Sequence, residues 1–241
     1  MGLGTPFATL FVRPHAFGVI AGVRLPDSKE PVPAEVLARL HPAEREAAAA
    51  LLGYRQPEWV GARLAWHAAA GSLGRPLEPL LSGPEHQPLG PAGVAVSLSH
   101  KRDLAVALVG PAQAGALGVD LEGDGRSRLR VAEKVLREEE RVALAALSPE
   151  RQWLEVMVRF AVKEAIYKAV HPVLRRYVGF HEASVEVDLS ALAVSEVLAD
   201  FTQLDGTSAP RAVLRSQPEP RLECVAEHAG GRVLAAVRAR W

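Results

Sequence analysis

Two acidic residues stand one residue apart in the segment 118–122, Gly-Val-Asp-Leu-Glu. Successive side chains of a β-strand point to opposite faces, so a strand here would project Asp120 and Glu122 together from one face. Two like charges held close together repel each other unless a cation, a proton or a basic side chain lies between them. A hard metal ion is a natural explanation for the pair. A solvated strand end is the alternative, and these five residues alone favour neither.

A second group of charged residues lies in the segment 160–168, Phe-Ala-Val-Lys-Glu-Ala-Ile-Tyr-Lys. Helical spacing would place Glu164 and Lys168 one turn apart on one face. With Lys163 they would line an edge of the helix that could face the two acidic residues of the strand. A Glu–Lys pair at this spacing is also a common surface stabiliser worth only about 0.3–0.5 kcal/mol. The pair by itself is therefore weak evidence for a site.

Two further segments could bind phosphate. Ser99 and His100 stand at the end of a predicted strand, and a histidine there can donate to a phosphate oxygen and, when charged, help to neutralise it. Arg55 and Arg63 flank a predicted helix start and could grip phosphates with two hydrogen bonds each. A solvated turn histidine and ordinary surface arginines are the alternatives.

The elements that must position these residues follow from periodicity, caps and breakers. Prolines, glycines and apolar spacing predict helices over 41–52, 58–73, 129–147 and 149–170, the last ending before Pro172. Apolar runs and alternation predict strands over 94–99, 104–109, 117–121, 183–187, 193–201, 221–227 and 232–237. Gly230-Gly231 predicts a hairpin turn between the last two. The pattern indicates two α+β halves that meet near residues 110–117.

Composition limits the class of protein. The chain has 241 residues and 49% hydrophobic content, enough to bury a substantial core, and its 28 basic residues balance its 28 acidic ones. No net charge therefore favours nucleic acid or an anionic membrane as a partner. The single cysteine, Cys224, cannot form an intrachain disulfide. No apolar run approaches the ~20 residues that a membrane span needs. We therefore expect a soluble, cytoplasmic protein.

In this order, the four segments resemble the motifs of the Sfp-type 4′-phosphopantetheinyl transferases, particularly the branch like the enterobactin-synthase enzymes. That family carries an Arg-x-x-Glu-aromatic-x-x-x-Arg segment, a Ser-x-Ser/Thr-His strand end, a Gly-x-Asp-x-Glu strand and a Lys-Glu-Ala/Ser-x-x-Lys helix. They appear here at 55–63, 97–100, 118–122 and 163–168. The likeness covers roughly residues 45–187. The last two motifs together are its most specific part.

The resemblance implies an α+β fold of two similar α/β subdomains related by a pseudo-twofold axis, with coenzyme A bound in the cleft between them. Residues 1–112 would form the N-terminal subdomain, and residues 113–241 the C-terminal one that carries the metal site. The implied enzyme moves the phosphopantetheine arm of coenzyme A onto a serine hydroxyl of an acyl or peptidyl carrier protein and releases 3′,5′-ADP. A monomer is implied, because both halves lie in one chain.

The resemblance also implies a role for each motif residue. Asp120, Glu122 and Glu164 would bind Mg²⁺. Glu164 or a metal-bound water would accept the proton of the carrier serine, and Lys168 would stabilise or protonate the departing phosphate, which makes Glu164 and Lys168 the catalytic pair. The residues that would bind coenzyme A are Arg55, Arg63, Ser99, His100, Lys163 and Lys168.

The sequence departs from the family pattern in one loop, and two other functions stay open. Relatives usually carry a lysine or arginine in the loop before the histidine strand, whereas residues 83–88 contain neither; Arg75 or Lys101 could substitute. One alternative function is a module that binds coenzyme A or a carrier protein without turnover. The other is a different Mg²⁺-dependent phosphoryl or nucleotidyl transferase, although the chain lacks a Gly-x-x-x-x-Gly-Lys-Ser/Thr loop.

Overall fold

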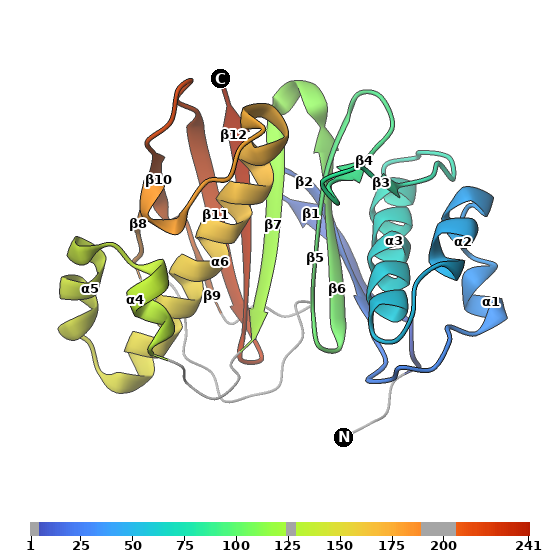
Figure 1. Ribbon diagram of the computed structural model, residues 1–241, viewed down its shortest axis with the longest axis horizontal. Helices are drawn as coiled ribbons and strands as arrows, with labels where there is room; N and C mark the ends of the chain where they lie inside the picture. Colours follow the sequence, from blue (N-terminus) through green and yellow to red (C-terminus); the bar gives the residue numbers. More distant parts are fainter. Residues whose placement is uncertain (1–4, 124–128, 189–205) are drawn as a thin grey trace. The chain divides into compact units, whose positions relative to one another are not determined.

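The computed structural model describes residues 5–123, 129–188 and 206–241, which divide into two compact units, Met1–Ala114 and Gly115–Trp241. Each unit combines an antiparallel sheet with helices (Figure 1), so the α+β class predicted from the sequence is confirmed. None of the helices in these ranges combines the length and the apolar character needed to cross a bilayer.

The first unit is a four-stranded antiparallel sheet with one long helix packed against it. Its strands, in spatial order, are β1 (Thr9–His15), β2 (Gly18–Arg24), β6 (Leu104–Pro111) and β5 (Val94–Lys101). A small hairpin pairs β3 (Leu81–Ser82) with β4 (Pro88–Leu89). The helices are α1 (Ala34–Leu37), α2 (Pro42–Ala49), α3 (Arg55–Ser72) and the short 3-10 turn η1 (Ala112–Ala114). The core lies between α3 and the sheet, around the fully buried Trp66.

Both helices and both strands predicted in this unit are confirmed, but β1 and β2 were not foreseen. The alternation of β1 is interrupted by Pro14, which cannot donate a ladder hydrogen bond. The sheet tolerates it because β1 is an edge strand, paired only with β2 in the sheet order.

The second unit is also a four-stranded antiparallel sheet with one long helix on a face. Its strands, in spatial order, are β7 (Ala116–Gly123), β12 (Arg232–Arg240), β11 (Arg221–Ala229) and β9 (Gly206–Ser208). A two-stranded sheet pairs β8 (Ala183–Glu186) with β10 (Arg211–Leu214). The helices are α4 (Val131–Val135), α5 (Glu138–Ala145), α6 (Pro149–Leu174) and the 3-10 turn η2 (Phe180–Glu182). Figure 1 shows α6 lying against the sheet, where its apolar side joins the core of this unit.

The predicted turn at Gly230-Gly231 is confirmed. The two glycines have φ of +54° and +70°, and they connect β11 to β12 directly after the paired residues Ala229 and Arg232. Positive φ at both central positions is the requirement of the two-residue turns that match strand twist.

Two helix predictions in this unit were wrong in their bounds. The helix expected over 129–147 is two short helices, because Leu136 takes an extended conformation between α4 and α5. The helix expected to end before Pro172 continues through it to Leu174 and ends at the left-handed Arg175. Proline removes one hydrogen bond of the helix. The loss costs less in the last turn than in the middle of the helix, because the Arg175 N–H closes this end by bonding to the His171 carbonyl. The strand predicted over 193–201 lies outside the described residues.

Acid is expected to destabilise the first unit through His15, at the end of β1. Burial, with a smaller contribution from Arg13, lowers the pKa of His15 from 6.5 to about 4. The neutral ring accepts a hydrogen bond at Nδ1 from the Phe17 N–H, at 3.2 Å. The unfolded chain binds the proton near pH 6.5 and the folded chain only near pH 4, so the free energy of unfolding should fall as the pH drops through this window, by roughly 3 kcal/mol at most.

Denaturant unfolding between pH 7 and pH 4 tests this expectation. His15→Gln, which keeps an acceptor but does not titrate, should flatten the pH dependence of the unfolding free energy. His86→Gln, at an exposed loop position, is the matched control and should leave the slope unchanged. An equal slope in the wild-type and His15→Gln proteins would contradict the prediction.

Candidate active site

A glycine brings the long helix of the second unit into contact with the strand that carries the acidic pair. A Cβ added at Gly118 would lie 1.8 Å from the carbonyl oxygen of Ala165 and 2.9 Å from the backbone nitrogen of Ala169. Only glycine allows the backbone of α6 to approach β7 this closely. Strand alternation puts Asp120 and Glu122 on the same face as Gly118, so this face is the one that α6 covers. Sequence reasoning assigned Gly118 no role, although a glycine inside a strand is a known sign of close backbone approach.

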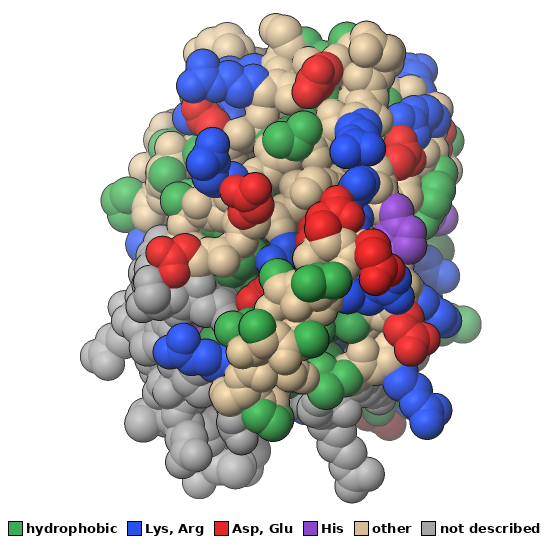
Figure 2. Space-filling model, turned by 90° about the vertical axis from the view of Figure 1, so that its left-hand side faces the viewer, with side chains coloured by type: hydrophobic (Ala, Val, Ile, Leu, Met, Phe, Trp, Pro, Cys, Tyr) green, Lys and Arg blue, Asp and Glu red, His purple; other side chains and the backbone are tan. Residues whose placement is uncertain are grey.

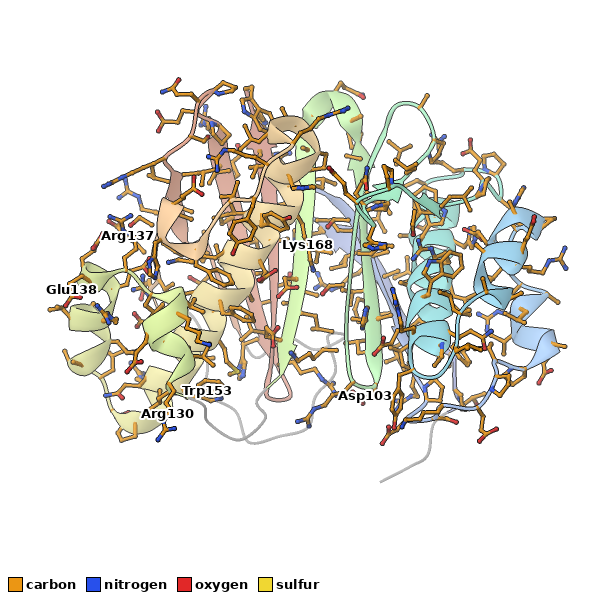
Figure 3. The ribbon with its side chains drawn as sticks, in the orientation of Figure 1. Asp103, Arg130, Arg137, Glu138, Trp153 and Lys168 are labelled. Carbon is orange, nitrogen blue, oxygen red and sulfur yellow. The ribbon has the colours of Figure 1, made fainter. Side chains whose placement is uncertain are left out.

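Asp120 and Lys168 form an ion pair between β7 and α6. The Lys168 Nζ donates to Asp120 Oδ1 at 2.6 Å and to the Val119 carbonyl oxygen at 3.0 Å. The side chain of Asp120 is 8% exposed and that of Lys168 is 29% exposed. Figure 3 shows Lys168 on the side of α6 that faces β7. The structure therefore brings together the acidic strand and the lysine of the helix motif, which lie 48 residues apart in the chain.

The other two carboxylates lie on the same two elements. Glu122 is half-buried on β7, where it pairs in register with Val233 of β12, and Glu164 is half-buried on α6, one turn before Lys168. The two elements run in opposite directions (Figure 1), so Glu164 lies further than Lys168 toward the Glu122 end of the strand. In the described part of the chain, however, no three His, Cys, Asp or Glu side chains lie close enough together to hold a metal ion.

Lys163 does not lie on the edge that the sequence predicted for it. Its Nζ is buried and donates to Glu140 Oε2 at 2.6 Å and to the Val135 carbonyl oxygen at 2.8 Å. Burial lowers the pKa of this ammonium, against the opposing hydrogen bond with Glu140. Neighbouring helix residues point about 100° apart, so Lys163 and Glu164 cannot share a face. The expectation that Lys163 lines an edge with Glu164 and Lys168 that could face Asp120 and Glu122 is wrong.

Arg63 of the first unit is also buried, at 5% exposure. Its Nε donates to the Leu80 carbonyl oxygen at 3.0 Å, and its Nη2 donates to Ser82 Oγ at 2.9 Å. Its guanidinium carbon lies 3.8 Å from the centre of the Trp59 ring. Burial lowers the pKa of Arg63 to about 10, with Glu44 acting in the opposite direction. These contacts tie the chain at residues 80–82 to α3. The expected phosphate-binding role of Arg63 stays a prediction.

The remaining sequence-predicted residues lie in the first unit. Arg55 is exposed at the start of α3. Ser99 is buried on β5, and His100 is exposed at the end of that strand. His100 Nδ1 lies 3.7 Å from Glu58 Oε1, a pair that is ionic only when the ring is protonated. The structure thus brings the arginine segment and the histidine strand end together within one unit. Phosphate binding by these residues stays a prediction.

Comparison with known families covers both units. The model of the 4′-phosphopantetheinyl transferase N-terminal domain matches residues 43–110, and that of the 4′-phosphopantetheinyl transferase superfamily matches residues 116–221. The chain belongs to the 4′-phosphopantetheinyl transferase family. The two matched regions contain all four segments selected from the sequence.

Individual members of this family are similar over about two thirds of their length. The 4′-phosphopantetheinyl transferase Svp of Streptomyces mobaraensis is 33% identical over 163 residues, which are 66% of this chain and 65% of that protein. The 4′-phosphopantetheinyl transferase Npt of Nocardia iowensis is 29% identical over 160 residues, 63% of this chain and 68% of that protein. A solved holo-(acyl-carrier-protein) synthase of Bacillus anthracis, in complex with coenzyme A, covers 52% of this chain and 95% of its own at 22% identity and a TM-score of 0.38.

The donor set of this phosphopantetheinyl transferase homologue suits a hard cation, but no three-carboxylate site is assembled. Asp120, Glu122 and Glu164 offer only oxygen ligands, as Mg²⁺ prefers. Proteins usually hold Mg²⁺ through one or two carboxylates together with substrate phosphates and water. The two carboxylates of β7 fit that pattern, and the Lys168 ammonium is paired with Asp120. The assignment of all three residues to one ion stays a prediction.

Proposed function

We propose that this chain transfers the phosphopantetheine arm of coenzyme A to a serine hydroxyl of an acyl or peptidyl carrier protein and releases 3′,5′-ADP. The observation that carries the proposal is the contact between Asp120 and Lys168 beside Gly118. This contact joins the acidic strand β7 to a lysine of α6. The two elements contain the two most specific motifs. We also assign the chain to the Sfp-type, enterobactin-synthase-like branch, on the order and spacing of its motifs.

The reaction forms a bond from the serine Oγ to the β-phosphorus of coenzyme A and breaks the bond from that phosphorus to the bridging oxygen, which leaves with 3′,5′-ADP. When bound, Mg²⁺ would withdraw negative charge from the diphosphate. Asp120, Glu122 and Glu164 would hold the ion. Glu164 would take the proton of the serine hydroxyl, because serine is a poor nucleophile at neutral pH. The Lys168 ammonium would stabilise or protonate the departing phosphate oxygen.

We also propose which residues bind coenzyme A, where in the cell the protein lies and that it is a monomer. Arg55, Arg63, Ser99 and His100 are our candidates for the phosphates of coenzyme A. We further propose a cytoplasmic monomer. Equal numbers of acidic and basic residues favour no nucleic acid or membrane partner.

Intact mass spectrometry of an apo-carrier protein tests the proposed function. With coenzyme A and Mg²⁺, the wild-type chain should add one phosphopantetheine group to each carrier. A panel of fatty-acid, polyketide and nonribosomal-peptide carriers would identify the preferred one. Tight binding of coenzyme A with no mass gain on any carrier would instead favour a binding module, and phosphorylation by a nucleotide would favour another phosphoryl transferase.

Single substitutions in the acidic set test its role. Asp120→Ala and Glu164→Ala are each expected to abolish transfer while circular dichroism shows a folded protein, because each removes an oxygen ligand from the diphosphate site. Glu133→Ala, an exposed glutamate on α4, is the matched control and should retain activity. Near wild-type kcat in both acidic-site variants would rule out this assignment of the metal site.

A further inference from the structure

Four charged side chains are buried together in the second unit. They are Glu140 on α5 and Glu155, Arg159 and Lys163 on α6, each between 3% and 5% exposed. We refer to these four residues as the Glu140 cluster. Charged groups are rarely buried unless they are paired, so the contacts in this cluster account for its presence.

Glu140 is the centre of the cluster. Its Oε2 accepts from Lys163 Nζ at 2.6 Å and from the Arg137 backbone N–H at 2.8 Å. Its Oε1 accepts from the Val185 backbone N–H at 2.8 Å and lies 3.4 Å from Arg159 Nη1. One carboxylate thus joins the start of α5, strand β8 and two basic residues of α6.

The two basic residues extend these connections. Arg159 donates to Glu155 Oε1 from Nε at 2.9 Å and from Nη2 at 2.6 Å, and it also donates to the Val185 carbonyl oxygen. Lys163 donates to the carbonyl oxygen of Val135, the last residue of α4. One side of α6 is therefore held to α4, α5 and β8 by charged hydrogen bonds.

This cluster differs from the ion pairs at the surface of the same unit. The face shown in Figure 2 carries acidic and basic side chains side by side, without a large area of one sign. Glu138 and Arg141 form such a pair, with side chains 75% and 41% exposed. Exposed pairs of this kind contribute little, whereas breaking a buried pair leaves an uncompensated charge without water. The Glu140 cluster therefore opposes rotation of α6 far more than the surface pairs do.

The position of the cluster along α6 relates it to the active site. Glu155, Arg159 and Lys163 recur every four residues and so form one stripe of the helix. Glu164 follows Lys163 directly and points about 100° around the helix axis. Any rotation of α6 that moved Glu164 or Lys168 relative to β7 would have to pull Lys163 away from Glu140.

We propose that Lys163 is a positioning residue for the transfer reaction and does not contact coenzyme A. Its ion pair with Glu140 holds α6 in place, so that Glu164 and Lys168 keep their orientation toward β7. The inference rests on the proposed function. It gives the first lysine of the Lys-Glu-x-x-x-Lys segment a role distinct from that of the second.

Steady-state kinetics of Lys163→Met, Glu140→Gln and the double variant test the proposal. Misplacing catalytic groups by about 1 Å can reduce the rate about a hundredfold, so we expect kcat to fall at least about tenfold in each single variant, with KM for coenzyme A within about twofold of wild type. Because both residues act through one contact, the double variant should be no slower than the slower single variant. Lys134→Met and Glu133→Gln, exposed positions on α4, are the matched controls and should behave as wild type.

A direct phosphate contact predicts a different result. In that case Lys163→Met would raise KM for coenzyme A about tenfold or more with kcat retained, and the effect of Glu140→Gln would add to it. That outcome would overturn the proposal. If a single variant does not fold, the double variant serves in its place, because removing both charges of a buried pair is better tolerated than removing one. Its kcat and KM are judged by the same criteria.

Amide hydrogen exchange supplies a readout that does not depend on activity. The Val185 and Arg137 amides, which Glu140 holds, should exchange faster in Lys163→Met than in the wild type, and the Lys134→Met control should not change them. Unchanged exchange at both amides would also overturn the proposal. A wild-type chain that modifies no carrier would refute the proposed function instead, so the two failures can be told apart.

Discussion

Gly118→Ala is expected to reduce both the stability of the second unit and transfer activity. The new Cβ would lie 1.8 Å from the Ala165 carbonyl oxygen and 2.9 Å from the Ala169 nitrogen. Both obstacles are backbone atoms of α6, so no side chain can rotate away to make room. The helix must move outward from β7. Overpacking of this kind costs about 1–3 kcal/mol or more.

The same displacement should separate the catalytic groups. Lys168 Nζ reaches Asp120 at 2.6 Å only because the helix backbone lies directly on the strand. A shift of about 1 Å in such a site can cost about a hundredfold in rate. We therefore expect the Gly118→Ala protein to show a lower denaturation midpoint and a kcat at least tenfold below wild type.

Gly71→Ala is the matched control for this experiment. Gly71 lies in α3 with open space around the position of a Cβ, so alanine there should be neutral or slightly stabilising, by up to about 1 kcal/mol. Denaturant unfolding and carrier-modification kinetics measure both variants. Wild-type stability and kcat in Gly118→Ala would show that α6 and β7 do not pack as described.

Lys168→Met is expected to reduce kcat by about a hundredfold to a thousandfold, because it removes the group that would stabilise or protonate the leaving phosphate. The lysine side chain is 29% exposed, but that of its partner Asp120 is only 8% exposed. Loss of the ammonium should therefore also lower stability, by less than the full cost of breaking a buried pair. A large loss of activity in a protein that still folds is the signature of a catalytic role.

Two further variants sharpen the Lys168 experiment. Lys168→Arg keeps the charge but replaces a compact ammonium with a wider, planar group, so we expect partial activity. Lys134→Met controls for the loss of one positive charge elsewhere in the unit and should be as active as wild type. A kcat for Lys168→Met close to that of the control would refute the catalytic role and leave only the ion pair with Asp120.

Much of the local structure could be predicted from the sequence, because it depends on residues close together in the chain. Strand alternation correctly placed Asp120 and Glu122 on one face of β7, and the two glycines at 230–231 correctly located the turn between β11 and β12. Helical spacing correctly put Glu164 and Lys168 on one helix, one turn apart. The four motifs that led to the family are likewise short segments with set spacing.

Only the tertiary structure decided which way the long helix faces. Lys163 and Lys168 have the same side-chain chemistry, yet α6 buries the first against Glu140 and turns the second to Asp120. The rotation of a helix depends on what packs against each side of it, here the close contact at Gly118 on one side and the Glu140 cluster on another. The partners of Lys168 on β7 lie 48 and 49 residues away along the chain, and Glu140 lies 23 residues from Lys163. The residue types and spacing within one segment therefore identify the reactive groups. The direction in which their side chains point depends on packing against segments that are distant in the chain.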